Sequence, residues 1–337
     1  MLVSRSGEVG HARATAPLGV VRIAKRLAPA PVWSRLRRLK VASAGVFQRS
    51  LERAGYTVAQ RDDYYSPLTS VTTLRATFDR WNRPSALKGV AFDVDAMKRD
   101  LSSLFDTYRS ELAALPSYED VKREGFGVGY NAFDAVLLYL MIRKTKPKRY
   151  VEVGAGMSTF YCGLAARENA REGHPLEITC IEPFPFEKLY SLPGLRVIPR
   201  QVQDVDLAVF AELAPNDVLF IDSTHVVKID GDVPFLFLEV LPRLGAGVVV
   251  HVHDISFPYN IPYPPEHWVL DRPWPMLWTE AMLLQAFLCM NDAFRITMSL
   301  PLIRHFDEAF LRETLPAYRG TAKDGDAFSS LWMTRVA

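Results

Sequence analysis

From residue 131 onward, short apolar runs alternate with amphipathic stretches. Asn131 can cap a helix that continues to a point before Pro147, and the apolar positions on most faces of this helix predict that it is buried. The apolar runs after it resemble strands of a parallel sheet that is covered on both faces. The predicted strands lie near residues 149–154, 176–182, 195–198, 217–222, 246–254, 294–298 and 328–335. This alternation predicts an α/β fold with a mostly parallel sheet and helices on both faces.

The chain before this α/β pattern predicts short helices and no strands. Residues 46–124 predict several short helices, among them 47–54 and 96–114, and we expect an accessory region that covers the mouth of the following domain. Tyr64 and Tyr65 in this region are candidates for substrate contacts, or they are ordinary packing aromatics.

Residues 1–45 are rich in arginine and are interrupted by prolines. Two interpretations stay open: a solvated, flexible tail, or an amphipathic segment that makes a peripheral contact with an anionic membrane surface. The segment lacks the apolar core and small-residue cleavage site of a secretory signal. A transit peptide also agrees with its composition.

Composition narrows the class of protein. The chain has 337 residues, of which 49% are hydrophobic, which suffices for one large domain and a smaller appendage. A formal net charge of +2 offers no global basis for binding nucleic acid. Cys162, Cys180 and Cys289 form no C-x-x-C motif, and no apolar run is long enough to span a bilayer. We therefore expect a soluble, cytoplasmic protein with reduced cysteines.

A glycine turn follows the strand near 149–154. Gly154 and Gly156 let the backbone turn sharply and let a ligand approach it closely. The dinucleotide fingerprint G-x-G-x-x-G would need a third glycine at position 159, where this chain has Thr159. The departure favours a ligand without a pyrophosphate.

Four stretches in order resemble the class I S-adenosylmethionine (SAM) dependent methyltransferases: Glu152-Val-Gly-Ala-Gly156, Ile178 to Glu182, Val218 to His225 and Gly247 to Asp254. The resemblance covers roughly residues 125–337 and implies a Rossmann-like, seven-stranded sheet with an antiparallel end. It also implies SAM as the cofactor. The expected organisation is a basic tail (1–45), an accessory region (46–124) and a methyltransferase domain (125–337).

The resemblance assigns cofactor residues at the carboxyl ends of the strands, where open α/β sheets bind ligands. Glu182 is the expected partner of the ribose hydroxyls, and Gln203 with Asp204 would border the adenine. The full expected set is Glu152, Gly154, Ala155, Gly156, Ser158, Thr159, Glu182, Gln203, Asp204 and Asp222.

Catalytic candidates follow the fourth and fifth strands. Asp222 ends one of them, and His225 has the residue type and ordinary pKa of a general base. By analogy with catechol-type O-methyltransferases, Asp222, His253 and Asp254 could bind a divalent ion such as Mg²⁺, although Mg²⁺ prefers oxygen ligands to imidazole. In the alternative without a metal, the two acids bind substrate or cap helices. We expect His251 to be a buried, hydrogen-bonded histidine.

An aromatic loop at residues 257–278 suggests the class of acceptor. Its tryptophans and tyrosines suit a sugar ring or an aromatic ring, and the same residues could instead pack on the sheet. Glu280 then opens an apolar helix that we expect to belong to the core.

Together these features predict a methyltransferase that modifies a hydroxyl group of a small molecule or a glycan. Two alternatives stay open. One is a SAM-binding or scaffold protein without turnover, and the other is a nucleotide-sugar or NAD-dependent enzyme. The sequence leaves open whether the protein forms a homo-oligomer.

Overall fold

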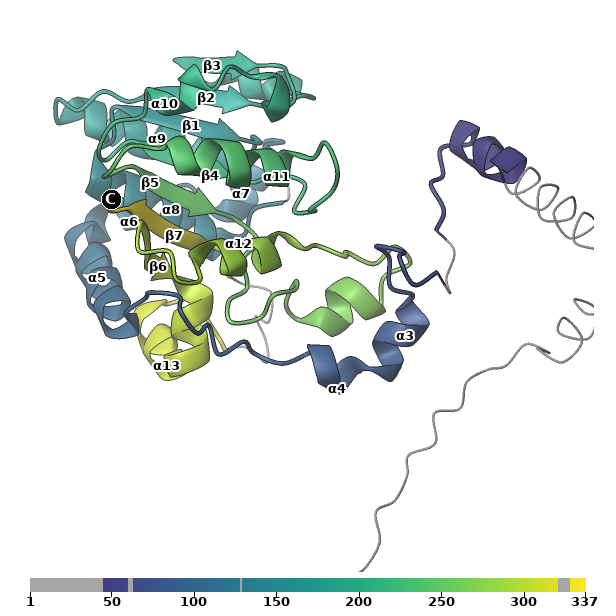
Figure 1. Ribbon diagram of the computed structural model, residues 1–337. Coiled ribbons are helices and arrows are strands. Elements are labelled where there is room, and N and C mark those ends of the chain that lie inside the picture. Colours follow the sequence, from purple (N-terminus) through teal and green to yellow (C-terminus); the bar gives the residue numbers. More distant parts are fainter. Residues whose placement is uncertain (1–44, 60–62, 128, 321–327) are drawn as a thin grey trace, which may run out of the picture. The chain divides into compact units, whose positions relative to one another are not determined.

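The computed structural model describes most of the chain (Figure 1), namely residues 45–59, 63–127, 129–320 and 328–337. It divides into two compact units, Met1–Ser70 and Val71–Ala337. The expected basic tail lies almost wholly outside the described residues, and so does its expected membrane contact.

The described part of the first unit contains one helix, at residues 45–53. Tyr64 and Tyr65 lie after it, are 92% and 87% exposed, and contact each other edge to face at 5.2 Å. Both are exposed rather than packed in a core. A role in contacting substrate stays a prediction.

The second unit is built on a seven-stranded sheet with the order β3-β2-β1-β4-β5-β7-β6. In this order, the first five strands (β3, β2, β1, β4 and β5) are each parallel to their neighbours among the five. Strand β7 is antiparallel to both β5 and β6. The strands are β1 (Arg149–Val153), β2 (Glu177–Ile181), β3 (Leu195–Ile198), β4 (Val218–Ile221), β5 (Val249–Val252), β6 (Phe294–Ser299) and β7 (Leu331–Arg335). The predicted α/β fold is confirmed, including its antiparallel end.

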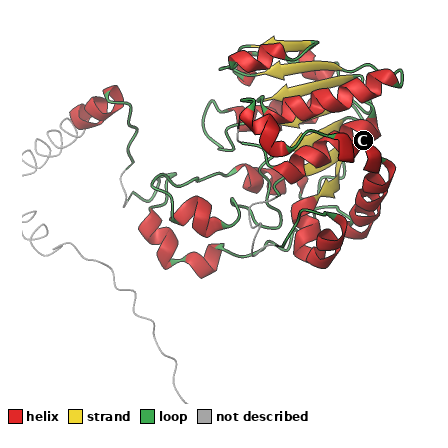
Figure 2. Ribbon diagram, turned by 180° about the vertical axis from the view of Figure 1, so that it is seen from behind, coloured by secondary structure: helices red, strands yellow, loops and turns green. Residues whose placement is uncertain are grey.

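Helices cover both faces of this sheet. Two opposite views each show helices in front of the strands (Figures 1 and 2). The longer ones are α5 (Val94–Thr107), α8 (Ala132–Thr145), α9 (Met157–Arg171), α12 (Glu280–Leu288) and α13 (Leu300–Thr314). The shorter ones include α3 (Val71–Ala76), α4 (Phe78–Trp81), α6 (Arg109–Ala114), α7 (Tyr118–Arg123), α10 (Ala208–Ala211) and α11 (Asp232–Phe235). The helix expected over 96–114 is divided at Tyr108, which ends α5 and precedes α6.

Helix α8 illustrates how the sequence produces the layers. Its N-cap Asn131 accepts a hydrogen bond from the Asp134 backbone N–H at 2.9 Å, and it ends at Lys146, whose φ is +44°. Most of its apolar residues are buried, and it packs against α9. The expected cap and burial of this helix are confirmed.

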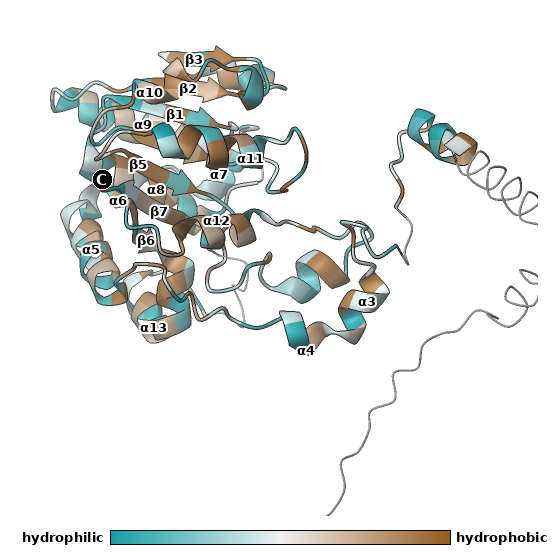
Figure 3. Ribbon diagram, in the orientation of Figure 1, coloured by the Kyte–Doolittle hydropathy of each residue, from teal (hydrophilic) through white to brown (hydrophobic). Residues whose placement is uncertain are grey.

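The strands form the apolar centre of the domain. All the residues of β4 and β5 are buried, and Figure 3 shows the hydrophobic colour concentrated along the strands. Among the described residues, no helix has the length and hydropathy needed to cross a bilayer.

Candidate active site

The glycine turn lies between the ends of β1 and β4. Gly154 has φ +98°, and a Cβ atom there would lie 2.5 Å from the carbonyl oxygen of Asp222. Only glycine fits this position, because both the backbone conformation and the space exclude a side chain. The close approach brings the glycine turn against Asp222, the first residue after β4.

Glu152 lies beneath this turn rather than in a cavity. Its fully buried carboxylate accepts hydrogen bonds from the Ser158 hydroxyl, from Thr159 Oγ1 at 2.7 Å and from Cys180 Sγ at 3.2 Å. Thr159 Oγ1 also accepts a bond from the Gly156 N–H at 3.0 Å. Burial raises the pKa of Glu152 to about 7, although these three side-chain hydrogen bonds lower it. The buried Glu152 carboxylate therefore stabilises the glycine turn through its hydrogen bonds.

A cavity of about 480 Å³ opens above the turn. It is lined by four of the residues expected to bind the cofactor: Gly154, Glu182, Gln203 and Asp222. The other expected residues are not part of its lining: Glu152, Ala155, Gly156, Ser158, Thr159 and Asp204. Most of these form the turn and its buried support, whereas Asp204 is exposed.

Glu182 follows β2 and has a carboxylate available for a ligand. One oxygen, Oε1, accepts the Phe184 N–H at 2.8 Å, and within the described chain the other oxygen has no hydrogen bond. Gln203 is held by its Nε2 donating to the Asp230 carbonyl at 2.9 Å. Their roles toward a ribose and a base stay predictions.

A second cavity, of about 760 Å³, lies on the other side of Asp222. Asp222 lines both cavities. The second cavity is also lined by His225, Asp254 and the aromatic residues Tyr263, His267, Trp268 and Trp278. Of the predicted catalytic residues, Asp222 therefore borders both cavities and His225 borders the larger one, which residues of the aromatic loop also line.

His225 lies at the centre of a group of acids. Its Nε2 is 3.3 Å from Asp222 Oδ1 and 3.3 Å from Asp254 Oδ2, and its Nδ1 is 2.8 Å from Glu280 Oε2. Burial disfavours the charged ring, but the hydrogen bonds with Asp222 and Glu280 outweigh it and raise the pKa of His225 to about 10. In this arrangement the ring holds a proton at neutral pH.

His253 approaches the same acids from the position directly after β5. Its Nδ1 lies 3.4 Å from Asp222 Oδ1 and 3.6 Å from Asp254 Oδ2, while its Nε2 lies 3.1 Å from Ser329 Oγ. Burial raises the pKa of Asp254, and the positive charges of the two histidines oppose this effect. Asp222 is affected differently: burial would raise its pKa, but the two imidazoles hold it below its ordinary value.

These side chains have the donor set of a divalent metal site. One ligand atom from each of Asp222, His225 and Asp254 lies within 4.8 Å of the others. The buried Nδ1 of His253 has no hydrogen-bond partner among the residues described and faces the same two carboxylates. The group within this distance contains His225 and not His253, so it differs from the expected ligands Asp222, His253 and Asp254, and a bound metal stays a prediction. Two imidazoles suit a transition metal better than Mg²⁺.

Sequence reasoning missed the acids behind the two histidines. Glu280 is 2% exposed and bonds to His225, although we expected its helix to serve only the core. Asp134, buried in α8, lies 3.6 Å from His253 Nε2 and accepts the Ser329 N–H at 2.8 Å. In both cases the available signal was a lone acid in an otherwise apolar helix, because a buried carboxylate requires a partner.

His251 departs from its expected hydrogen bonding. The ring is fully buried and stacks on Phe220 at 4.4 Å with an interplanar angle of 4°. Neither of its nitrogens has a hydrogen-bond partner within the described chain. Burial lowers the pKa of His251 to about 3, so the ring is neutral and packs as an aromatic group.

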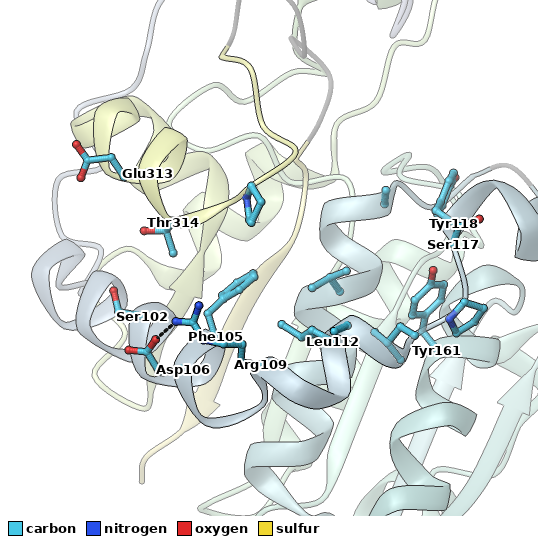
Figure 4. A pocket seen from close by; sticks show the side chains of 16 residues that line it. Ser102, Phe105, Asp106, Arg109, Leu112, Ser117, Tyr118, Tyr161, Glu313 and Thr314 are labelled. Carbon is cyan, nitrogen blue, oxygen red and sulfur yellow. Dashed lines mark hydrogen bonds and ion pairs between the residues drawn. The ribbon is translucent and has the colours of Figure 1, made fainter.

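Another cavity, of about 690 Å³, lies away from these residues, among α5, α6, α8 and α13 (Figure 4). Its lining mixes apolar and polar side chains, and its Arg109 is paired with Asp106 at 2.7 Å. None of the predicted site residues lines it.

Comparison with known proteins finds one matching family model and a set of similar solved structures. Residues 151–255 match the model of a family described as a methyltransferase domain, and no curated protein matches. Similar solved structures include the O-methyltransferase TomG from Streptomyces achromogenes in complex with SAM (17% identity, 79% of this chain and 96% of that one, TM-score 0.36). Another is an O-methyltransferase from Bacillus cereus with S-adenosylhomocysteine (SAH) (13% identity, 80% and 100% of the two chains, TM-score 0.36). Likenesses at this level carry no argument about the site or its substrate.

The family match spans the glycine turn, the strand that leads to Glu182 and the loop that holds Asp222 and His225. It ends just after Asp254, at the end of β5. Residues 151–255 of this chain therefore match a methyltransferase domain, carried on the mostly parallel seven-stranded sheet.

Proposed function

We propose that the protein transfers the methyl group of SAM to a hydroxyl oxygen of a small molecule or a saccharide. One observation carries this proposal: Asp222 lines both the cavity above the glycine turn and the larger cavity with aromatic walls. A donor in the first cavity and an acceptor in the second would meet at this carboxylate. The acids and imidazoles that handle protons are gathered at the same place.

The reaction needs an oxygen nucleophile in line with the sulfonium. The methyl–sulfur bond breaks as the oxygen–methyl bond forms, and the electron pair of the broken bond goes to sulfur, which leaves neutral SAH. The hydroxyl proton must go to a base. Asp254 is suited to receive it because burial raises its pKa, and Asp222 can orient the hydroxyl.

His225 was expected to be this base, but in this arrangement it carries a proton. Its imidazolium can stabilise the carboxylates and the developing alkoxide, and it can act as a base only after it has given up that proton. A divalent ion held by Asp222, His225, His253 and Asp254 would supply the positive charge instead and acidify the acceptor hydroxyl.

Calorimetry with the full chain tests the cofactor. We expect SAM and SAH to bind and NAD and UDP-glucose not to bind. At a ligand concentration of 100 Kd, SAH should stabilise the protein by about 2.7 kcal/mol in thermal unfolding. Preference for NAD or UDP-glucose would contradict the proposal.

Turnover separates an enzyme from a SAM-binding scaffold. SAH formation is measured with a panel of phenols, sugars and hydroxy acids, after treatment with EDTA and after adding back Mg²⁺, Mn²⁺ or Zn²⁺. An enzyme forms SAH with at least one acceptor. Activity that is insensitive to EDTA would remove the metal from the mechanism and leave the proton transfer to Asp254.

A further inference from the structure

Four side chains that line the larger cavity contact one another in succession, and we call them the aromatic ladder: Arg272, Trp268, Trp278 and His225. The Arg272 guanidinium lies 5.0 Å from the centroid of the Trp268 ring, and Trp268 is stacked with Trp278 at 6.4 Å and 22°. Trp278 in turn lies 4.5 Å from the His225 ring. The ladder thus joins a cation at one end to the acids of the candidate active site at the other.

The Arg272 charge has no carboxylate partner among the residues that the structure describes. Its nearest polar contact is Met276 Sδ, at 3.5 Å from Nη1, and no acid of the described chain lies within ion-pair distance of it. The neighbouring Asp271 is paired with Arg75 at 3.3 Å. Arg109, which lines the cavity among α5, α6, α8 and α13, differs because Asp106 pairs with it. Arg272 is therefore an unneutralised cation that lines a cavity.

The loop holds this cation in place. The Met276 N–H donates to the Trp268 carbonyl at 3.0 Å and closes the turn that contains Arg272. The guanidinium is half-buried and lies on the Trp268 face. Packing and the cation–π contact with this ring therefore both hold it in position.

We propose that the acceptor is a hydroxylated ring compound that carries an anionic group, a carboxylate or a phosphate. The anion binds Arg272, the ring lies along the two tryptophans, and the hydroxyl reaches Asp222 and Asp254. This proposal rests on the proposed methyl transfer, because only that reaction assigns the hydroxyl to the acidic end. The acids at that end would repel an anion, which sets the orientation of the molecule.

Binding to matched pairs of probes tests the charge. The full chain, saturated with SAH, is titrated with 3,4-dihydroxybenzoate and its neutral amide, and with glucuronate, glucose 6-phosphate and glucose. At least one acid should bind about tenfold or more tightly than its neutral match, as expected for a charge-assisted hydrogen bond. The carboxylate and phosphate probes distinguish the two sources of the anion.

Variants tie the preference to Arg272. Arg272→Gln keeps most of the stem that packs on Trp268 but loses the charge, and it should abolish the preference. Arg272→Lys should retain part of it, and Arg196→Gln, at an exposed site on β3, should leave it unchanged. The melting temperature of each variant is measured alongside, so that unfolding is not mistaken for lost binding.

The two proposals fail differently. Acids that bind no better than their neutral matches, including no binding of either, would overturn the anionic acceptor, and so would a preference that survives in a folded Arg272→Gln variant. Neither result affects SAM binding. A chain that does not bind SAM or SAH would overturn the methyl transfer itself.

Discussion

The Nδ1 atom of His225 lies 2.8 Å from Oε2 of Glu280, an acid buried at the start of α12. This contact fixes the ring so that Nε2 faces Asp222 and Asp254. We expect Glu280→Gln to lower kcat about 10- to 100-fold, as loss of an orienting partner does, while the Kd for SAM stays unchanged. Steady-state kinetics and calorimetry measure the two effects. Glu239→Gln, at an exposed site, is the control.

His225 itself should matter for turnover and not for cofactor binding, because it lines only the acceptor cavity. We expect His225→Asn to lower kcat by roughly 10²- to 10⁴-fold, the usual range for a group that handles protons or charge in the transition state. The exposed His174 provides a matched control, His174→Asn. An unchanged kcat in the His225 variant would remove this residue from the mechanism.

Glu182 should show the opposite pattern. Its carboxylate lines the cofactor cavity, and we expect Glu182→Ala to raise the Kd for SAM about 10- to 100-fold through the loss of hydrogen bonds to a charged acceptor. At saturating SAM, kcat should change little. Calorimetry compares it with Glu187→Ala, an exposed acid outside the lining of that cavity. Equal affinity in the two variants would place the ribose elsewhere.

Gly154 and Gly163 offer a contrast between two glycines. Gly154→Ala places a Cβ atom against the Asp222 carbonyl at a positive φ, so it should destabilise the protein by about 1–3 kcal/mol and weaken SAM binding. Gly163 lies within α9 with no atom within 4 Å of the added Cβ, and Gly163→Ala should stabilise by up to about 1 kcal/mol. Thermal unfolding measures both, and equal melting temperatures would contradict the close approach.

Glu152 predicts a specific pH dependence of stability. Its pKa of about 7 in the fold lies above its ordinary 4.5, so its contribution is present below pH 4.5 and is lost as the pH rises to about 7. The free energy of unfolding of Glu152→Gln, relative to the wild type, should therefore rise by about 3 kcal/mol across that interval. Urea unfolding at several pH values measures this difference. Glu177→Gln, an exposed acid on β2, should run parallel to the wild type.

Local patterns were sufficient to predict the fold and to place several candidate cofactor residues around one cavity. The apolar runs predicted every strand of the sheet, and the glycine turn with Glu182 and Asp222 was placed at strand ends, because consecutive parallel strands end at one edge. Gly154, Glu182, Gln203 and Asp222 do line one cavity. Asp204 is exposed and lies outside its lining, since neighbours in sequence on a short helical turn point in different directions.

The acceptor half could not be read in the same way, because its residues come from distant segments. Glu280 lies 55 positions after His225, and only the packing of α12 brings them together. The charge of His225 also depends on this packing. The ordinary pKa of histidine lies near neutral pH, and here the neighbouring acids raise it.

The sequence alone thus determined which residues end the strands, because side-chain periodicity and glycine placement are local properties. Only the tertiary structure decided which buried acids face the histidines and that, in the part of the chain it describes, no carboxylate lies beside Arg272. The charge state of each of these groups depends on which other charges lie within a few ångströms of it. Those neighbours come from segments that are distant in the sequence.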